Sequence, residues 1–236
     1  TIGILAESGS QRFSALQAEL PARIGKMAKA HKVKNIVHLS AIGADLNSAS
    51  VYARTKAQGE EGLLAEFPKA VILRPSLVFG AGDGFFNRFA SMAVLAPGLP
   101  VIGGGKNKVQ TVYVGDVAEA VLAGLTQKGT EGKIFELGGP EVMTFRQAME
   151  YIIKQIKRRR MLLPIPHGVM TLAATAMSVL PSAPVTRDQL KLLKVDNIAS
   201  ADRPGLDDLG IQPTPIDLIV PSYLERYQPG GRFAVK

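Results

Sequence analysis

Tyr52-Ala53-Arg54-Thr55-Lys56 is the stretch that decides the fold of this chain, because of the segments on either side of it. It begins a segment, residues 50–67, that is rich in Ala, Glu and Lys and is predicted to be a helix. An apolar run at 35–40 precedes this helix, and a second one at 70–73, ended by Arg74-Pro75, follows it. Both runs have the length and composition of buried strands. Strand, helix and strand in this order predict a parallel α/β sheet whose strands end at one edge.

The segments around this unit extend the same alternation. Residues 1–5 are predicted to be a strand and residues 13–32 a helix. Thr144 and Thr186 are each followed three residues later by Gln, a spacing that predicts a capped helix start. Further elements are expected as a loop at 80–84, helices at 85–96, 116–126 and 168–180, strands at 109–114 and 134–137, and an extended carboxyl-terminal tail.

Composition excludes several classes of function. The 236 residues are 46% hydrophobic and 20% charged, which suits a folded protein. There is no cysteine, so disulfide scaffolds, thiolate zinc sites and thiol catalysis are excluded. The net charge of +8 is spread along the chain, and only 6% of residues are aromatic, a pattern that does not favour nucleic-acid binding. The three histidines lack metal-ligand spacing, so no metal site is expected.

Tyr52 and Lys56 form the strongest local chemical signal. Positions four apart on a helix share a face, so the phenol and the ammonium should project together. A nearby ammonium favours the phenolate, which predicts a lowered pKa for Tyr52. The same Lys56 could also donate to the ribose hydroxyls of a nicotinamide nucleotide. Taken alone, such a pair usually marks a solvated helix face, so its meaning depends on the surrounding phrases.

These surrounding phrases resemble the extended and atypical short-chain dehydrogenases. The resemblance rests on the strand ending Leu39-Ser40-Ala41, on Tyr52 and Lys56, on the phrase from Leu73 to Gly80 and on the phrase Val112-Tyr-Val-Gly-Asp-Val-Ala118. It implies a Rossmann-like, doubly wound parallel sheet with a smaller carboxyl-terminal α/β lobe. Residues 1–80, with 109–126 returning to them, would bind the nucleotide, and 81–236 would form the smaller lobe and tail. The nucleotide-binding residues that it implies are Gly3, Ile4, Leu5, Ser40, Ala41, Tyr52, Lys56, Pro75, Ser76, Leu77 and Val78.

Two departures from the family pattern bear on catalysis. The family's catalytic Ser is the second residue of a Ser-Ser pair, and that pair is Ser40-Ala41 here. The hydroxyl that would orient a substrate carbonyl is therefore missing from this register. In addition, no glycine-rich phosphate loop lies on a strand-to-helix turn within residues 1–236. In the family this loop follows the first strand, so its residues and the choice between NADPH and NADH are expected upstream of Thr1.

A more specific resemblance covers nearly the whole chain. It rests on the phrases Gly3 to Ser8, Val37 to Asp45, Leu137 to Pro140, Thr186 to Gln189 and Tyr223 to Phe233. These phrases are similar to the NAD(P)H-binding accessory subunits of respiratory complex I, the NADH:ubiquinone oxidoreductase, in their alphaproteobacterial form.

That resemblance implies a tightly held NADPH, or NADH, that is not turned over and that stabilises the assembly. It implies a membrane-associated, peripheral place in the respiratory chain, on the cytoplasmic face of the bacterial inner membrane or the matrix side in mitochondria. The partners would be other subunits of the hydrophilic arm. A membrane surface is a second candidate partner, since the apolar helix at 168–180 and the basic residues 157–160 would suit a docking surface.

Two other functions stay open at this point. The chain could be a soluble reductase, epimerase or dehydratase of the short-chain dehydrogenase type, with Tyr52 as general acid and base and Lys56 as its electrostatic partner. It could also be a regulator that senses the redox state of the nucleotide through the same pocket. No catalytic residue is expected under the accessory-subunit hypothesis, because Ala41 stands where the hydroxyl would be.

Overall fold

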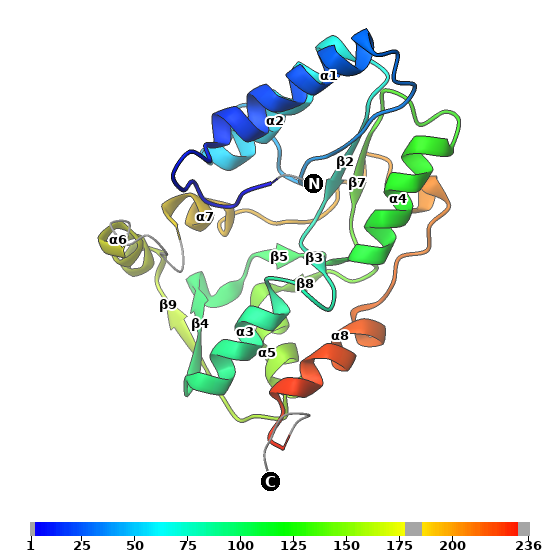
Figure 1. The fold of residues 1–236 in the computed structure, drawn as a ribbon. Coiled ribbons are helices and arrows are strands. Elements are labelled where there is room, and N and C mark those ends of the chain that lie inside the picture. Colours follow the sequence, from blue (N-terminus) through cyan, green and yellow to red (C-terminus); the bar gives the residue numbers. More distant parts are fainter. Residues whose placement is uncertain (1–2, 178–185, 231–236) are drawn as a thin grey trace.

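The computed structural model describes residues 3–177 and 186–230, and Figure 1 shows their arrangement. Its central sheet contains three parallel strands in the order β1 (Val37–Leu39), β2 (Val71–Pro75) and β7 (Ile134–Leu137). Val37 pairs with Val71, and Ile72 pairs with Ile134. The parallel sheet that the sequence predicts is therefore confirmed, with the middle strand buried on both faces.

Helices cover both faces of this sheet, and the side chains of β2 show how. Ile72 packs with Leu63 of α2 (Val51–Glu66), on the side where α1 (Leu20–Ala30) also lies. Val71 and Leu73 point the other way and pack with Ala120 of α4 (Val114–Thr126). This alternation is the period of a strand, and it makes the sheet doubly wound.

The second hydrophobic cluster belongs to the later part of the chain. It joins α3 (Phe86–Leu95), α5 (Phe145–Gln155) and α8 (Ile216–Leu224) around β4 (Gly98–Ile102). β4 pairs in parallel with β9 (Met161–Ile165), and α6 (His167–Met177) and α7 (Arg187–Leu192) follow. Figure 1 shows this group below the three-stranded sheet. This cluster shares no buried residue with the cluster between the sheet and α4. The domain boundary that the sequence predicts at residue 80 stays a prediction.

Shorter elements complete the structure. They are the π-helical turn Ser14–Glu19, the pair β3 (Val78–Phe79) and β6 (Val112–Tyr113), the pair β5 (Lys108–Val109) and β8 (Met143–Thr144), and the 3-10 turns Gly103–Gly105, Asp207–Leu209 and Glu225–Tyr227. Both predicted capping boxes are confirmed: Thr144 accepts from Gln147 N, and Thr186 accepts from Gln189 N. None of the helices described here is both long and apolar enough to cross a membrane.

Three predictions about elements are wrong. Residues 3–5 are not a strand, since Leu5 is 63% exposed and Gly3 to Leu5 have no strand partner in the part described. The strand expected at 109–114 is split into β5 and β6, which pair with different strands. The tail is not extended throughout, because α8 buries Ile216, Val220 and Leu224 against the second cluster. The end of the helix predicted at 168–180 and residues 231–236 lie outside the described residues.

Candidate functional site

The first turn of α2 is fixed from outside the helix by a distant carboxylate. Ser50 is the N-cap residue, and its hydroxyl accepts from Ala53 N at 3.4 Å. The same hydroxyl donates to Asp188 Oδ2 at 2.7 Å. Val51 N donates to Asp188 Oδ1 at 2.8 Å, and Tyr52 N donates to Asp188 Oδ2 at 3.0 Å. We call this set of three hydrogen bonds the Asp188 brace; it fixes the turn that carries Tyr52.

Lys56 reaches from α2 to the carboxyl end of β1. Its side chain is buried, and Nζ donates to the Leu39 carbonyl at 3.2 Å. Burial lowers the pKa of Lys56, against the opposing effect of the Glu60 carboxylate. The ammonium is therefore placed at the edge of the sheet where ligands of doubly wound folds bind.

Tyr52 lies one helical turn before Lys56 and is half-buried, and its ring packs edge-on against Phe13 with 6.1 Å between centroids. Burial raises the pKa of Tyr52 to about 12. The lowered pKa that the helical spacing predicts is therefore wrong: removing water from around the phenol disfavours its ionised form. At neutral pH, Tyr52 is a phenol that can donate one hydrogen bond.

Polar atoms at the end of β1 lack protein partners. Ser40 N donates to Leu73 O at 2.7 Å, but Ser40 Oγ is buried and has no partner among the described residues. His38 Nε2 is also buried and has no hydrogen-bond partner among the described residues. Burial, with a smaller contribution from Lys56, lowers the pKa of His38 to about 4. Buried polar atoms normally have partners, so Ser40 Oγ beside the Lys56 contact suits a bound polar group. Ala41, which follows, is half-buried.

The turn after β2 is held by Asn197. Ser76 Oγ donates to Asn197 Oδ1 at 2.5 Å, and Leu77 N donates to the same oxygen at 3.1 Å. Pro75 ends β2, and Val78 begins β3. The structure thus places residues 75–78 at the same carboxyl edge of the sheet as Ser40, while the hydroxyl of Ser76 is already used within the protein.

The residues predicted near the amino terminus lie on a loop. Ile4 O accepts from Gln17 Nε2 at 2.8 Å, and Gln17 Oε1 accepts from Thr55 Oγ1 at 3.0 Å. Leu5 O accepts from Gln189 Nε2 at 3.3 Å, and Gly3 is exposed. The backbone of this loop therefore lies beside the π-helical turn and α7, although it is not the strand that the sequence predicts.

Sequence reasoning missed Asp188 and Asn197 as parts of the site. The capping box at Thr186 gives the start of α7, which places Asp188 in its first turn, but nothing in the spacing points to α2. Burial alone would raise the pKa of Asp188; hydrogen bonds from Ser50, Tyr52 N and Val51 N outweigh it and hold this pKa below its ordinary value. Asp188 therefore carries its negative charge at the amino end of α2, where the helix dipole favours an anion.

A second surface lies at the opposite end of the molecule, below α5. A hollow of about 720 Å³ is lined by the end of α5, residues 157–160 and the start of β9. Lys154, Lys157 and Arg159 are exposed there, whereas Arg158 donates to Tyr227 O and Arg160 donates to Ala93 O. We call this surface the basic hollow.

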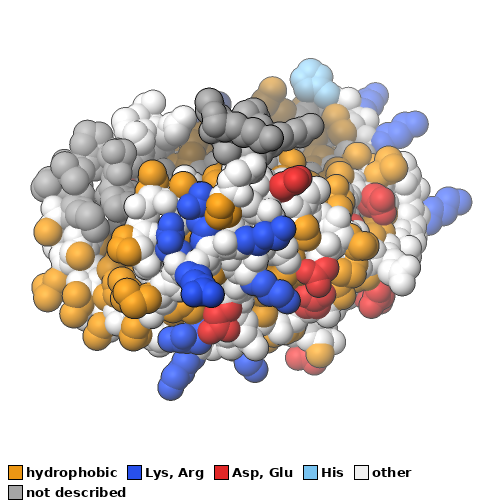
Figure 2. Space-filling view, turned by 90° about the horizontal axis from the view of Figure 1, so that it is seen from below, with side chains coloured by type: hydrophobic (Ala, Val, Ile, Leu, Met, Phe, Trp, Pro, Cys, Tyr) orange, Lys and Arg blue, Asp and Glu red, His pale blue; other side chains and the backbone are white. Residues whose placement is uncertain are grey.

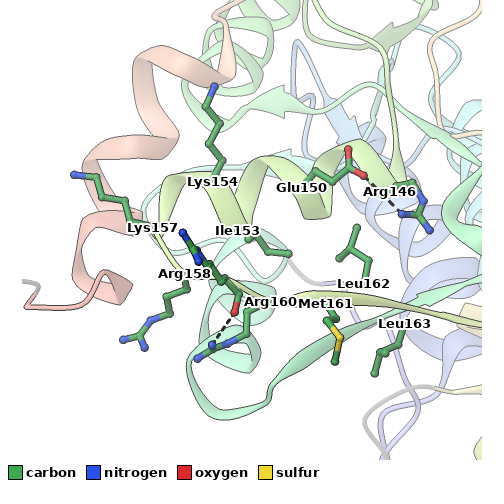
Figure 3. A pocket seen from close by; sticks show the side chains of 11 residues that line it. Arg146, Glu150, Ile153, Lys154, Lys157, Arg158, Arg160, Met161, Leu162 and Leu163 are labelled. Carbon is green, nitrogen blue, oxygen red and sulfur yellow. Dashed lines mark hydrogen bonds and ion pairs between the residues drawn. The ribbon is translucent and has the colours of Figure 1, made fainter.

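Apolar side chains border the basic hollow. Met161 is 64% exposed and Leu163 is 44% exposed on the same rim. Figure 2 shows Lys and Arg side chains gathered beside hydrophobic ones on this face. Elsewhere, the described residues include no group of His, Asp and Glu that could hold a metal ion.

Comparisons of the sequence with known proteins identify relatives of this chain. The sequence is 31% identical over 229 residues to "NADH dehydrogenase [ubiquinone] 1 alpha subcomplex subunit 9, mitochondrial" of Mus musculus, covering 96% of this chain and 60% of that protein. It is 32% identical over 241 residues to the protein of the same name from Arabidopsis thaliana, covering 98% and 60%. The chain therefore spans about three fifths of the length of these relatives.

A solved structure shows the same fold. The NADPH-dependent quinone oxidoreductase of Escherichia coli, complexed with NADPH, superposes with a TM-score of 0.70 at 21% identity, over 92% of this chain and 74% of that one. The sequence model of the NAD dependent epimerase/dehydratase family matches residues 10–138, more than half of the chain and all of α2 with its flanking strands. The chain belongs to the NAD dependent epimerase/dehydratase family.

Proposed function

We propose that this protein is a nucleotide-binding accessory subunit of respiratory complex I, in which the bound nucleotide stabilises the fold and is not turned over. The observation that carries the proposal is the likeness to the mouse and Arabidopsis subunits over nearly the whole chain. The site geometry supports the absence of turnover. Ala41 offers no hydroxyl to orient a carbonyl, and a Tyr52 pKa of about 12 makes the phenol a poor base at neutral pH.

The cofactor of this proposal is NADPH, with NADH as the alternative. Lys56 Nζ would bind the ribose hydroxyls, and Tyr52, Ser40, Ala41 and the turn at 75–78 would surround the nicotinamide half. The unpartnered Ser40 Oγ and the buried Lys56 ammonium fit such a polar group. A bound nicotinamide nucleotide could supply hydride chemistry, yet in this proposal the residues around it serve to bind and orient it.

The proposed partners are other subunits of the hydrophilic arm, with the protein peripheral on the cytoplasmic face of the bacterial inner membrane, or on the matrix side in mitochondria. A membrane surface is a further proposed partner, through the basic hollow. Exposed cations next to exposed apolar side chains suit anionic phospholipid headgroups.

The basic hollow can be tested with vesicles. Changing Lys154, Lys157 and Arg159 to Gln should reduce binding to phosphatidylglycerol vesicles by roughly 100-fold, since each cation near an anionic surface contributes about 1 kcal/mol. A matched control changes exposed Lys29, Lys69 and Lys128 to Gln, at the end of the molecule near α1. Equal losses in both triple variants would show that overall charge, and not the basic hollow, governs binding.

The experiment that tests the function is a native gel of host membranes extracted in mild detergent, with the bands analysed by mass spectrometry. Migration with complex I, and release of stoichiometric NADPH on denaturation, is the expected result. Migration as a small soluble species would overturn the proposal and favour a free enzyme centred on Tyr52. The variant pair Tyr52→Phe and Lys56→Met refines the test, because only loss of Lys56 should release nucleotide and loosen the subunit.

A further inference from the structure

The helix α7 contacts the amino end of α2 through Asp188 and Lys191, and the loop at residues 3–5 through Gln189. Asp188 forms the brace, Gln189 Nε2 donates to Leu5 O at 3.3 Å, and Lys191 Nζ donates to Ala49 O at 2.9 Å. These contacts join parts of the chain that are more than one hundred residues apart. The helix α7 is therefore attached to the turn that carries Tyr52.

The other face of α7 is attached to α6. Leu190 is 3% exposed and forms a small hydrophobic cluster with Ala174 of α6 and Ile102 of β4, with Met170 and Leu193 packed against it. α6 in turn exposes Val169 and Leu172 to solvent, at 56% and 75%. A continuous set of contacts thus leads from the first turn of α2, through α7, to an exposed apolar helix at the side of the molecule (Figure 1).

We propose that Asp188 is a positioning residue that couples nucleotide occupancy at α2 to the docking of α7 and α6. This inference rests on the proposed nucleotide binding by Tyr52 and Lys56. It assigns a purpose to a nucleotide that is not turned over: the nucleotide sets whether the helices α6 and α7 are held in place. The exposed face of α6 would then be presented in one fixed position only when the nucleotide is bound.

The physical basis is that the nucleotide and the Asp188 carboxylate would both order the first turn of α2. The nucleotide would contact the side chains of Tyr52 and Lys56, whereas Asp188 binds the backbone N–H groups of Val51 and Tyr52. Whichever partner binds first bears the entropic cost of ordering the turn, so the second binds more tightly. By linkage the effect is reciprocal: loss of the brace weakens nucleotide binding by the factor by which nucleotide strengthens the brace.

Hydrogen exchange of the intact protein, purified from its host membranes, tests this coupling. In the wild type, NADPH should slow amide exchange in residues 187–192 and 167–177. In Asp188→Asn this protection should disappear, and the Kd for NADPH should rise roughly 10-fold, because charged hydrogen bonds to the helix end are lost. Ser50→Ala, which removes one of the three hydrogen bonds but keeps the carboxylate, should give an intermediate result.

Asp116→Asn is the matched control. Asp116 is another buried carboxylate that joins distant segments, accepting from Thr214 N at 2.8 Å and Thr214 Oγ1 at 2.7 Å; these hydrogen bonds join α4 to the segment before α8 and do not involve α7. Its substitution should leave the NADPH protection of α6 and α7 unchanged. NADPH binding by the wild type without any change in α7 exchange would overturn the coupling and leave the proposed function intact. Absence of NADPH binding by the wild type would overturn both.

Discussion

Tyr52 and Lys56 lie one turn apart on α2, yet burial, and not the Lys56 ammonium, governs the pKa of Tyr52. Lys56 Nζ donates to the Leu39 carbonyl, and burial raises the pKa of Tyr52 to about 12. The spacing predicts which side chains are neighbours, but the pKa depends on how much water reaches them. Phe13, which packs edge-on against Tyr52, helps to set that access of water, and the local sequence around Tyr52 does not reveal its position.

The pH dependence of stability should reveal the buried His38. Its pKa is about 4 in the folded protein, against 6.5 for an exposed histidine. Between these values the unfolded chain binds a proton that the folded protein does not, so the free energy of unfolding falls as the pH drops from 6.5 to 4. The contribution of His38 to this fall is at most about 3 kcal/mol.

Urea unfolding at pH 7 and at pH 4.5 measures this effect. In His38→Leu the difference between the two pH values should be smaller than in the wild type, because leucine does not titrate. His31→Leu is the control, since His31 is exposed. Equal pH dependence in the wild type and His38→Leu would show that His38 is accessible to protons in the folded protein.

Among the ion-paired residues near the site, Arg74 should be the one whose substitution lowers the free energy of unfolding most. Its guanidinium lies 2.6 Å from Glu60 Oε2 and 3.4 Å from Glu136 Oε1, and all three side chains are largely buried. Arg74→Met would leave the buried Glu60 without its ion-pair partner and Glu136 with only the more exposed Arg203, and should lower the free energy of unfolding by about 3–5 kcal/mol. Chemical denaturation of the wild type and of Arg74→Met measures this difference in the free energy of unfolding.

Arg203→Gln is the matched control for Arg74→Met. Arg203 lies 3.6 Å from the same Glu136 but is 42% exposed, so its loss should cost less than about 1 kcal/mol. A loss below about 1 kcal/mol for Arg74→Met as well would indicate that water reaches Glu60 and Glu136 and compensates their charges.

At the scale of elements, local signals predict those helices and strands whose ends and faces the sequence marks. The capping boxes at Thr144 and Thr186 predict α5 and α7, and the apolar runs predict β1, β2 and β7. The pair β4 and β9 could not be predicted, because these segments contain Pro100 and Pro164 and pair across about sixty residues. α8 was missed for a similar reason: its helical state depends on burial against α3 and α5.

The capping box of α5 allows a direct test of an element's local stabilisation. Thr144 Oγ1 accepts from Gln147 N at 3.1 Å, so Thr144→Ala removes a partner of an otherwise free amide. The free energy of unfolding should fall by about 1 kcal/mol. Thr126→Ala, at the exposed carboxyl end of α4, should change it by less than half of that, and thermal unfolding compares the two. Equal effects would mean that the box is not formed in solution.

The contact of α2 with the preceding π-helical turn depends on Gly59. A Cβ at this position would lie 1.9 Å from Gln17 O, a backbone atom that cannot move aside without shifting the turn. Gly59→Ala should therefore destabilise the protein by more than about 2 kcal/mol, although Ala is the better helix former. Gly62→Ala is the control in the same helix, since the tightest contact of its Cβ would be with the Ala22 methyl at 3.0 Å and no backbone atom outside α2 would lie closer than 3.8 Å. A stabilised Gly59→Ala would contradict the close packing.

At the scale of the whole molecule, the candidate site is assembled from segments that the sequence keeps far apart. Ser40, Tyr52 and Lys56 come from one α/β unit and could be predicted from their phrases. Asp188 binds Tyr52 N across 136 residues and Asn197 binds Ser76 across 121 residues, and no local sequence pattern predicts these pairings. The parallel sheet is thus predictable from periodicity and the candidate site residues from the family resemblance, whereas the residues that brace the site depend on how the later part of the chain packs.

Nucleotide binding should therefore stabilise the whole molecule and not the first α/β unit alone. A ligand that binds only the folded state at 100 times its Kd adds about 2.7 kcal/mol to the free energy of unfolding. For a protein of this size, NADPH should raise the Tm by roughly 5–10 °C. Differential scanning fluorimetry of the intact protein, before and after removal of NADPH, measures the shift. Lys56→Met should abolish the shift, and Lys29→Met, at an exposed position on α1, should retain it. A shift that survives in Lys56→Met would place the nucleotide elsewhere on the molecule.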